Sequence, residues 1–250
     1  MARYHARHGG QPGDALDLLN DVPEAQRDDP RILEVMVYAY LRIGEPGAAL
    51  ESARKLAAQL PDNVVALRLL ARAERANDDP AASERHLRRA LELQPEDFES
   101  RKLLVEALLI QNKLREADEA VQAFPPGALP EAQVNLTRGR IAATLGDVET
   151  GERLLRQAWA QAPASNTARL LASVLWAQPG KRNEAIELLE GWLARAPEDA
   201  AVQQQLGSYH VLEGNDARAL PLFEALLERR PDDVVAMNNI AWLLRKSEPG

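Results

Sequence analysis

Three kinds of residue recur at a spacing of 34 positions along this chain of 250 residues. One is a proline, one is a glycine or a residue that tolerates a left-handed backbone, and one is a small residue. The prolines are Pro61, Pro95, Pro163, Pro197 and Pro231; the left-handed positions are Gly10, Gly44, Asp78, Asn112, Gly146, Gly180 and Gly214; the small residues are Ala15, Ala49, Ser83, Ala117, Gly151, Ala185 and Ala219. Three independent markers with one period indicate an array of similar units.

Each marker has a physical role in a pair of helices. The left-handed residue ends the first helix, and the small residue allows the two helices to cross closely. The proline ends the second helix, because it cannot continue one. Apolar residues between the markers follow the helical period, as at Leu67, Leu70 and Ala71. We therefore predict an all-α solenoid of antiparallel helix pairs, with at least thirteen helices and no sheet.

The composition agrees with helices and argues against several classes of protein. Hydrophobic residues make up 46% of the chain but aromatic residues only 4%, a mixture that favours helices over strands. No apolar run is long enough to insert into a membrane, and the first ten residues lack the apolar core of a signal peptide. The net charge of −8 argues against nucleic acid as a partner. The absence of cysteine excludes disulfides.

The pattern resembles the tetratricopeptide repeat, whose 34-residue helix pairs stack into a right-handed superhelix. The resemblance covers residues 1–250 as a single domain, with six complete repeats starting near residues 30, 64, 98, 132, 166 and 200. A half repeat at each end, the last one starting near residue 234, predicts a fragment of a longer repeat protein. Ile240, Leu243 and Leu244 are then expected to be uncovered, which predicts weak self-association. The alternative is that the helix over residues 234–246 is itself a cap.

One repeat is irregular. Its second helix runs into Pro125, Pro126 and Gly127, and these residues cannot remain helical. The helix is therefore expected to end about one turn early. Either a hinge or a tolerated surface loop would explain the break, and the sequence leaves both open.

The sequence gives little sign of chemistry. His5 and His8 share a helix face without a third ligand, and His210 falls on an inward position that suits a satisfied core residue. No phosphate-binding loop follows a strand, because no strand is expected. We therefore expect no catalytic residue, no metal site and no cofactor, and we do not expect an enzyme.

The family resemblance implies a binding groove lined by the second, fifth, ninth, twelfth and thirteenth positions of each repeat. In four repeats these positions hold seven bases, namely Arg31, Arg42, Arg68, Arg72, Arg75, Lys102 and Arg140, and three acids, namely Glu34, Glu99 and Glu106. Tyr38 lies among them, Leu170 and Val174 belong to a neutral, partly apolar stretch that follows, and Trp242 lies in the last helix. The carboxylate clamp of some family members is disfavoured, because its asparagines are missing.

The predicted function is a protein-interaction scaffold whose groove binds a peptide or protein with an acidic segment. The alternative for the arginines is that they pair with neighbouring acids. The alternative for the function is a structural spacer or a polysaccharide-contacting element of a secretion assembly.

A narrower resemblance concerns residues 236–244, AMNNIAWLL. This segment is similar to a motif of bacterial repeat lipoproteins that accompany exosortase-type sorting and exopolysaccharide export, and to periplasmic repeat arrays. It implies a periplasmic or outer-membrane-associated parent, whereas the rest of the sequence leaves the location open.

Overall fold

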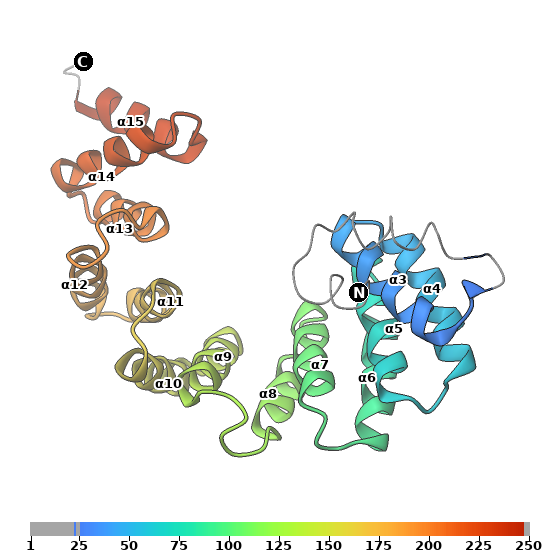
Figure 1. Ribbon diagram of the computed structural model, residues 1–250. Helices are drawn as coiled ribbons and strands as arrows, with labels where there is room; N and C mark the ends of the chain where they lie inside the picture. The colour runs from blue at the N-terminus through green and yellow to red at the C-terminus, as the bar shows by residue number, and fades with distance from the viewer. Residues whose placement is uncertain (1–22, 24–25, 248–250) are drawn as a thin grey trace. The chain divides into compact units, whose positions relative to one another are not determined.

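The computed structural model describes residue 23 and residues 26–247, and among them it contains thirteen α-helices and no strand (Figure 1). The helices are α3 (Pro30–Ile43), α4 (Pro46–Gln59), α5 (Val64–Ala76), α6 (Pro80–Leu93), α7 (Phe98–Ile110), α8 (Leu114–Gln122), α9 (Glu131–Thr144), α10 (Val148–Gln161), α11 (Ser165–Trp176), α12 (Arg182–Leu193), α13 (Ala200–Leu212), α14 (Asp216–Arg229) and α15 (Val234–Ser247). The predicted all-α class is confirmed. The predictions for His5, His8, Gly10 and Ala15 lie outside the described residues.

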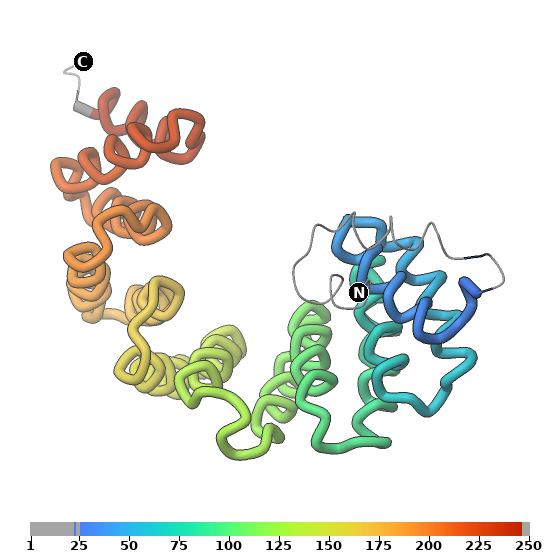
Figure 2. Tube along the Cα trace, viewed as in Figure 1, coloured from blue at the N-terminus to red at the C-terminus, as the bar shows by residue number. Residues whose placement is uncertain are grey.

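The chain divides into two compact units, residues 1–129 and residues 130–250. Unit one contains α3 to α8, and unit two contains α9 to α15. Consecutive helices pack on each other within each unit, and successive odd-numbered helices are also in contact from α3 to α7 and from α9 to α13 (Figure 2). We call the odd-numbered helices first helices and the even-numbered helices second helices. The prediction that residues 1–250 form one domain of a longer repeat protein stays a prediction.

The turns between the two helices of a repeat adopt the left-handed backbone that the markers predicted. Gly44 has a φ of 79°, and Asp78 and Asn112 have φ values of 59° and 57° in the equivalent turns. A positive φ is uncommon for residues other than glycine, and Asp and Asn accept it most readily. The two substitutions for glycine therefore keep the turn intact.

The small residues lie where two helices cross, as expected. Ala49 and Ala185 are fully buried. At Gly151 an added Cβ atom would lie 3.0 Å from the backbone nitrogen of Ala143. The helices of a repeat therefore approach so closely that a larger side chain has no space.

A glutamate that is mostly shielded from solvent joins neighbouring repeats inside each unit. Glu152 of α10 accepts hydrogen bonds from Gln178 at 2.7 Å, Lys181 at 2.5 Å and Arg156 at 3.0 Å. Burial alone would raise the pKa of Glu152, but these donors hold the pKa at about 2. Glu84 of α6 has the same arrangement, with Gln111 and Lys113 as donors from the following repeat.

The helix α11 begins one residue earlier than the 34-residue period predicts. Only Ala164 separates Pro163 from the helix, and the extra residue Pro179 in the next turn restores the period. As a result α11 is rotated relative to the prediction, since one residue corresponds to about 100° of a helix. Val174, which was predicted to face the groove, is only 9% exposed. The helix α11 thus begins at Ser165, one residue before the position near which this repeat was expected to start.

Two other local predictions have different outcomes. The helix α8 has nine residues and ends at Gln122, so the prediction of an early end is confirmed. In α15, Leu243 packs into a buried cluster with Phe223 and Leu226 of α14. The prediction that Leu243 is uncovered is wrong, because it faces the preceding second helix. Leu244 is exposed, as expected, and Val234, Val235, Met237 and Trp242 of the same helix are exposed as well.

Among the described residues, no helix is long and apolar enough to cross a lipid bilayer.

Candidate binding surface

Three ion pairs join the first helices α5 and α7 in unit one. Arg68 lies 3.0 Å from Asp97, Arg72 lies 3.3 Å from Glu99, and Arg75 pairs with Glu106. We call these three pairs the ion-pair ladder. The Arg68 side chain is only 15% exposed, so most of this groove arginine is covered.

The ladder lowers the positive charge that the sequence predicted for this surface. The seven bases and three acids at the groove positions give a net charge of +4. This net charge falls to +2 when Asp29 and Asp97, which pair with two of the bases, are included. Asp29 pairs with Arg31 at 3.0 Å. The pKa of Asp97 is lowered, because hydrogen bonds from Ser100 and the charge of Arg68 outweigh burial. The arginines of α5 therefore pair with neighbouring acids, which was the alternative interpretation.

The predicted groove residues of α3 are only partly accessible. Glu34 is 7% exposed, Tyr38 is half-buried, and Arg42 is exposed near the end of the helix. Arg31 and Glu34 line a hollow of about 180 Å³ together with residues of α4 and α5. Lys102 of α7 is exposed. Neither Lys102 nor Arg140 has an ion pair within the part of the chain that the structure describes.

Unit two contains a pocket of about 270 Å³ between α9, α10 and α11. It brings together three residues that the sequence singled out, namely Arg140, Leu170 and Val174. The remaining lining residues are Ala143, Thr144, Val148, Leu155, Ser173 and Ala177. Most of this surface is apolar, and Arg140 is its one charged side chain. We call it the α9–α11 pocket.

Unit two also contains a stacked aromatic pair that the sequence did not predict. Trp176 stacks on Tyr209 with ring centroids 3.9 Å apart, and the guanidinium of Arg182 lies 5.2 Å from the Trp176 ring centroid. Trp176 is partly buried and packs against the hydrophobic core of unit two. Tyr209 covers one face of its ring, so that face is not free for a ligand. Trp242 is exposed, with Lys246 4.9 Å from its ring centroid.

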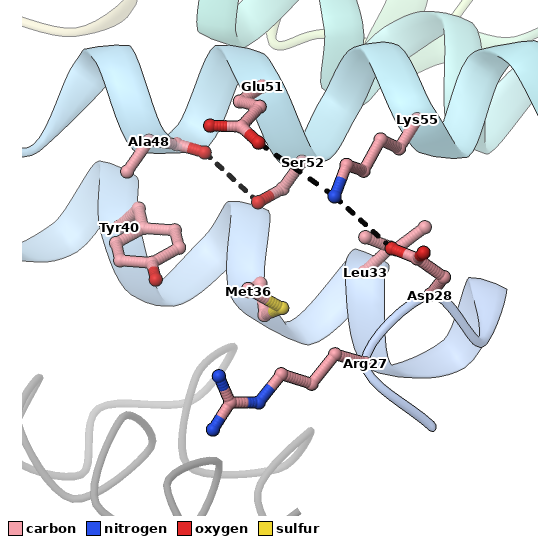
Figure 3. Close-up of a pocket in the computed structure, with 9 residues that line it drawn as sticks. All are labelled: Arg27, Asp28, Leu33, Met36, Tyr40, Ala48, Glu51, Ser52 and Lys55. Atoms are coloured by element: carbon pink, nitrogen blue, oxygen red, sulfur yellow. Dashed lines mark hydrogen bonds and ion pairs between the residues drawn. The ribbon is translucent and has the colours of Figure 1, made fainter. Parts of the chain in front are cut away.

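A further hollow of about 330 Å³ lies on α3 and α4 (Figure 3). Lys55 bridges Asp28 at 3.2 Å and Glu51 at 3.8 Å across it, and Ser52 donates to the carbonyl of Ala48. Because the lysine already has two carboxylate partners, this hollow offers less unsatisfied charge than the α9–α11 pocket.

Each of the two described histidines lies near a glutamate of the chain. His86 lies 2.8 Å from Glu74, and His210 is 2% exposed with its Nε2 atom 3.7 Å from Glu190. The Nδ1 atom of His210 has no hydrogen-bond partner, so the expectation of a fully satisfied core histidine is wrong for this atom. Burial lowers the pKa of His210. No group of three or more potential metal ligands occurs among the described residues.

Stacked helix pairs define a helical-repeat protein. The first helices carry ion pairs in unit one and line an apolar pocket in unit two. Models of the tetratricopeptide repeat match residues 142–207 and residues 64–107. Together with the fold and the repeat markers, these matches identify the chain as a tetratricopeptide-repeat protein. No curated protein matches it.

Several solved structures share the fold at low sequence identity. The C-terminal part of a tetratricopeptide-repeat protein from Cytophaga hutchinsonii is 9% identical, with a TM-score of 0.69 over 96% of this chain and 98% of that one. PilW, a type IV pilus biogenesis factor, is 17% identical, with a TM-score of 0.68 over 87% and 99% of the two chains. YrrB, a repeat protein with an unusual peptide-binding site, is 14% identical, with a TM-score of 0.53 over 76% and 98%.

Proposed function

We propose that this protein is a scaffold that holds a segment of a partner protein against its first helices. The fold supports a role in protein interaction, and the related fold of YrrB carries a peptide-binding site. The observation that carries the proposal is the α9–α11 pocket, a mostly apolar hollow on the first helices with Arg140 beside it. Pockets of this kind combine apolar contact with a small number of polar groups that fix orientation.

The proposed partner segment contains acidic residues. Lys102 and Arg140 are two groove bases without an ion pair among the described residues, and both are exposed. A carboxylate near either side chain would gain a charge-assisted hydrogen bond. This is a weaker preference than seven free bases would produce, because the ladder neutralises the arginines of α5.

Site-specific photo-crosslinking tests this proposal. A photoreactive residue at Leu212, which is the exposed end of first helix α13, is expected to capture a partner in cells that produce the protein. The matched control is Glu187, an exposed position on second helix α12. Equal capture at both positions, or capture only at Glu187, contradicts binding along the first helices.

We also propose weak self-association through α15. Met237 and Leu244 leave an apolar face of this helix exposed, and Leu244 is 50% exposed. Exposed apolar patches of this kind favour association. Sedimentation velocity at increasing concentration should show a shift that Leu244→Glu abolishes, and a concentration-independent coefficient for the wild type contradicts the proposal.

The envelope setting rests on the resemblance of residues 236–244 alone. PilW is assigned to type IV pilus biogenesis, but it shares only the fold with this chain. Both the exopolysaccharide context and the spacer alternative therefore stay hypotheses, and fractionation of producing cells would test the location.

A further inference from the structure

The space between successive first helices is filled by different side chains in the two units. Positions of α9 correspond to those of α5 at a shift of 68 residues, and positions of α11 correspond to those of α7 at a shift of 67 residues. The shift of α11 is supported by hydrogen bonds. Gln111 donates to the carbonyl of Ala107 and to Glu84, and Gln178 donates to the carbonyl of Val174 and to Glu152.

In unit one this space is filled by charged side chains. Arg75 and Glu106 meet across it, and Arg72 pairs with Glu99 at its side. Each guanidinium thus has a carboxylate from the next first helix. The ladder closes the space between α5 and α7 with side chains of the chain itself.

In unit two the same positions hold smaller residues. Ala143 stands where α5 has Arg75, and Ser173 stands where α7 has Glu106. Because these side chains are short, they leave the α9–α11 pocket open. The pocket is therefore the space that the ladder occupies in the other unit.

Unit two keeps an arginine at the position of Arg72 but lacks the glutamate that pairs with Arg72 in unit one. Arg140 stands where α5 has Arg72, but Asn166 stands where α7 has Glu99. Arg140 lines the pocket and is exposed, and no carboxylate pairs with it among the described residues. The pocket therefore combines an apolar wall, to which Leu155, Leu170 and Val174 contribute, with a guanidinium that lacks an acid.

We propose that the α9–α11 pocket binds a partner segment that carries an apolar side chain next to a carboxylate. The carboxylate of the partner pairs with Arg140 in the way that Glu99 pairs with Arg72 in unit one. The apolar side chain of the partner fills the space that Arg75 and Glu106 fill in unit one. This proposal rests on the proposed scaffold function and names the chemistry of its partner. The volume of about 270 Å³ lies below the range of typical small-molecule sites, so it suits one or two side chains.

Three small probes test the two halves of this recognition separately. N-acetyl-L-leucine carries both the apolar side chain and the carboxylate, N-acetyl-L-leucinamide lacks the carboxylate, and N-acetylglycine lacks the side chain. Binding to the full chain is followed through the backbone amide signals of Ser173 and Ala177 in ¹H–¹⁵N spectra. N-acetyl-L-leucine is expected to bind about threefold to fivefold more tightly than the amide, which is the range of an exposed ion pair. It should also bind more tightly than N-acetylglycine, which keeps the carboxylate but loses the burial of the leucine side chain.

A matched pair of variants tests the role of Arg140. Asn166→Glu restores the acid that α7 has at the equivalent position, and it should pair with Arg140 and remove the preference for N-acetyl-L-leucine over the amide. Asn166→Gln keeps a neutral amide and should leave the preference unchanged. Since residue 166 lies in the first turn of α11, a new acid there is compatible with the helix. Arg140→Gln should remove the same preference without any change at residue 166.

The outcomes separate this inference from the proposed function. Equal binding of N-acetyl-L-leucine and its amide, signal changes outside the pocket, or an unchanged preference in Asn166→Glu and Arg140→Gln overturns the inference. Partner capture at Leu212 would still stand in that case, so the scaffold function would survive. Loss of capture at Leu212 with intact probe binding would instead refute the scaffold function.

Discussion

Replacement of Glu152 by glutamine should weaken unit two measurably. The Glu152 side chain is 12% exposed and lies at the centre of a network that joins α10 to the following repeat. Gln178 and Lys181 reach it from that repeat, and Arg156 reaches it from its own helix. A glutamine has similar shape but no charge, so the change removes the electrostatic part of the network.

The pKa of Glu152 sets the size of the effect. A fall from 4.5 to about 2 corresponds to about 3.4 kcal/mol of stability if the whole fall is specific to the folded state. The side chains of Lys181 and Arg156 are 39% and 43% exposed, so solvent screens part of this interaction. We therefore expect Glu152→Gln to lower the free energy of unfolding by about 1 to 2 kcal/mol at pH 7.

The pH dependence has a definite sign. The folded pKa lies below the unfolded pKa, so the contribution of Glu152 is complete above about pH 4.5 and is lost as the pH falls towards 2. The gap between the wild type and Glu152→Gln should therefore narrow through this range. Urea unfolding followed by circular dichroism at pH 7 and near pH 3 measures the gap.

Glu149→Gln is the matched control, because Glu149 is an exposed carboxylate on the same helix. It should change the free energy of unfolding by less than about 0.5 kcal/mol. If Glu152→Gln is as stable as the wild type at pH 7, or if its deficit persists unchanged near pH 3, the argument about this network is wrong.

Three further predictions concern packing, titration and the ladder. Gly207→Ala should cost about 1 to 3 kcal/mol in urea unfolding, because the new Cβ would lie 2.7 Å from the Phe223 ring; Gly191→Ala meets no atom within 4 Å and should be neutral or slightly stabilising, and the reverse order would refute the packing. Burial lowers the pKa of His210, so its contribution to stability should be lost as the pH falls below about 6.5; His210→Leu should flatten the unfolding free energy between pH 7 and 5, and an unchanged slope would contradict this. Arg68→Ala should cost about 1 to 2 kcal/mol in urea unfolding, because it leaves a partly buried carboxylate unpaired; no loss would show that the ladder is only a surface feature.

Short-range rules explain what the sequence predicted correctly. A left-handed turn at Asp78 or Asn112 depends on the residue itself, and the end of α8 at Gln122 follows from the two prolines that come after it. Burial of Ala49 and Ala185 follows from the crossing of two helices that adjoin in sequence. The fold class, the repeat and the helix pairs could therefore be read from local patterns with one period.

The sequence predicted the residues of the candidate site less accurately, because these residues depend on the rotation of one helix, α11. The proline and glycine markers keep their spacing around α11, since one residue lost after Pro163 is regained at Pro179. The helix between them is nevertheless shifted by one residue, which turns Val174 inwards and Ser173 outwards. Gln111 precedes Lys113 by two positions, whereas Gln178 precedes Lys181 by three. This difference in spacing is the sequence signal that could have revealed the shift.

The sequence by itself determined an all-α array of helix pairs, since the turns, helix ends and small crossing residues each act within a single repeat. Only the tertiary structure decided which charges on the first helices are already paired and which are left over. Arg72 and Arg140 occupy the same position of their repeats, but Arg72 meets Glu99 whereas the equivalent place beside Arg140 holds Asn166. The physical reason is that a side chain's electrostatic environment comes from residues 27 to 31 positions away on the next first helix, and a shift of one residue there changes which side chain it meets.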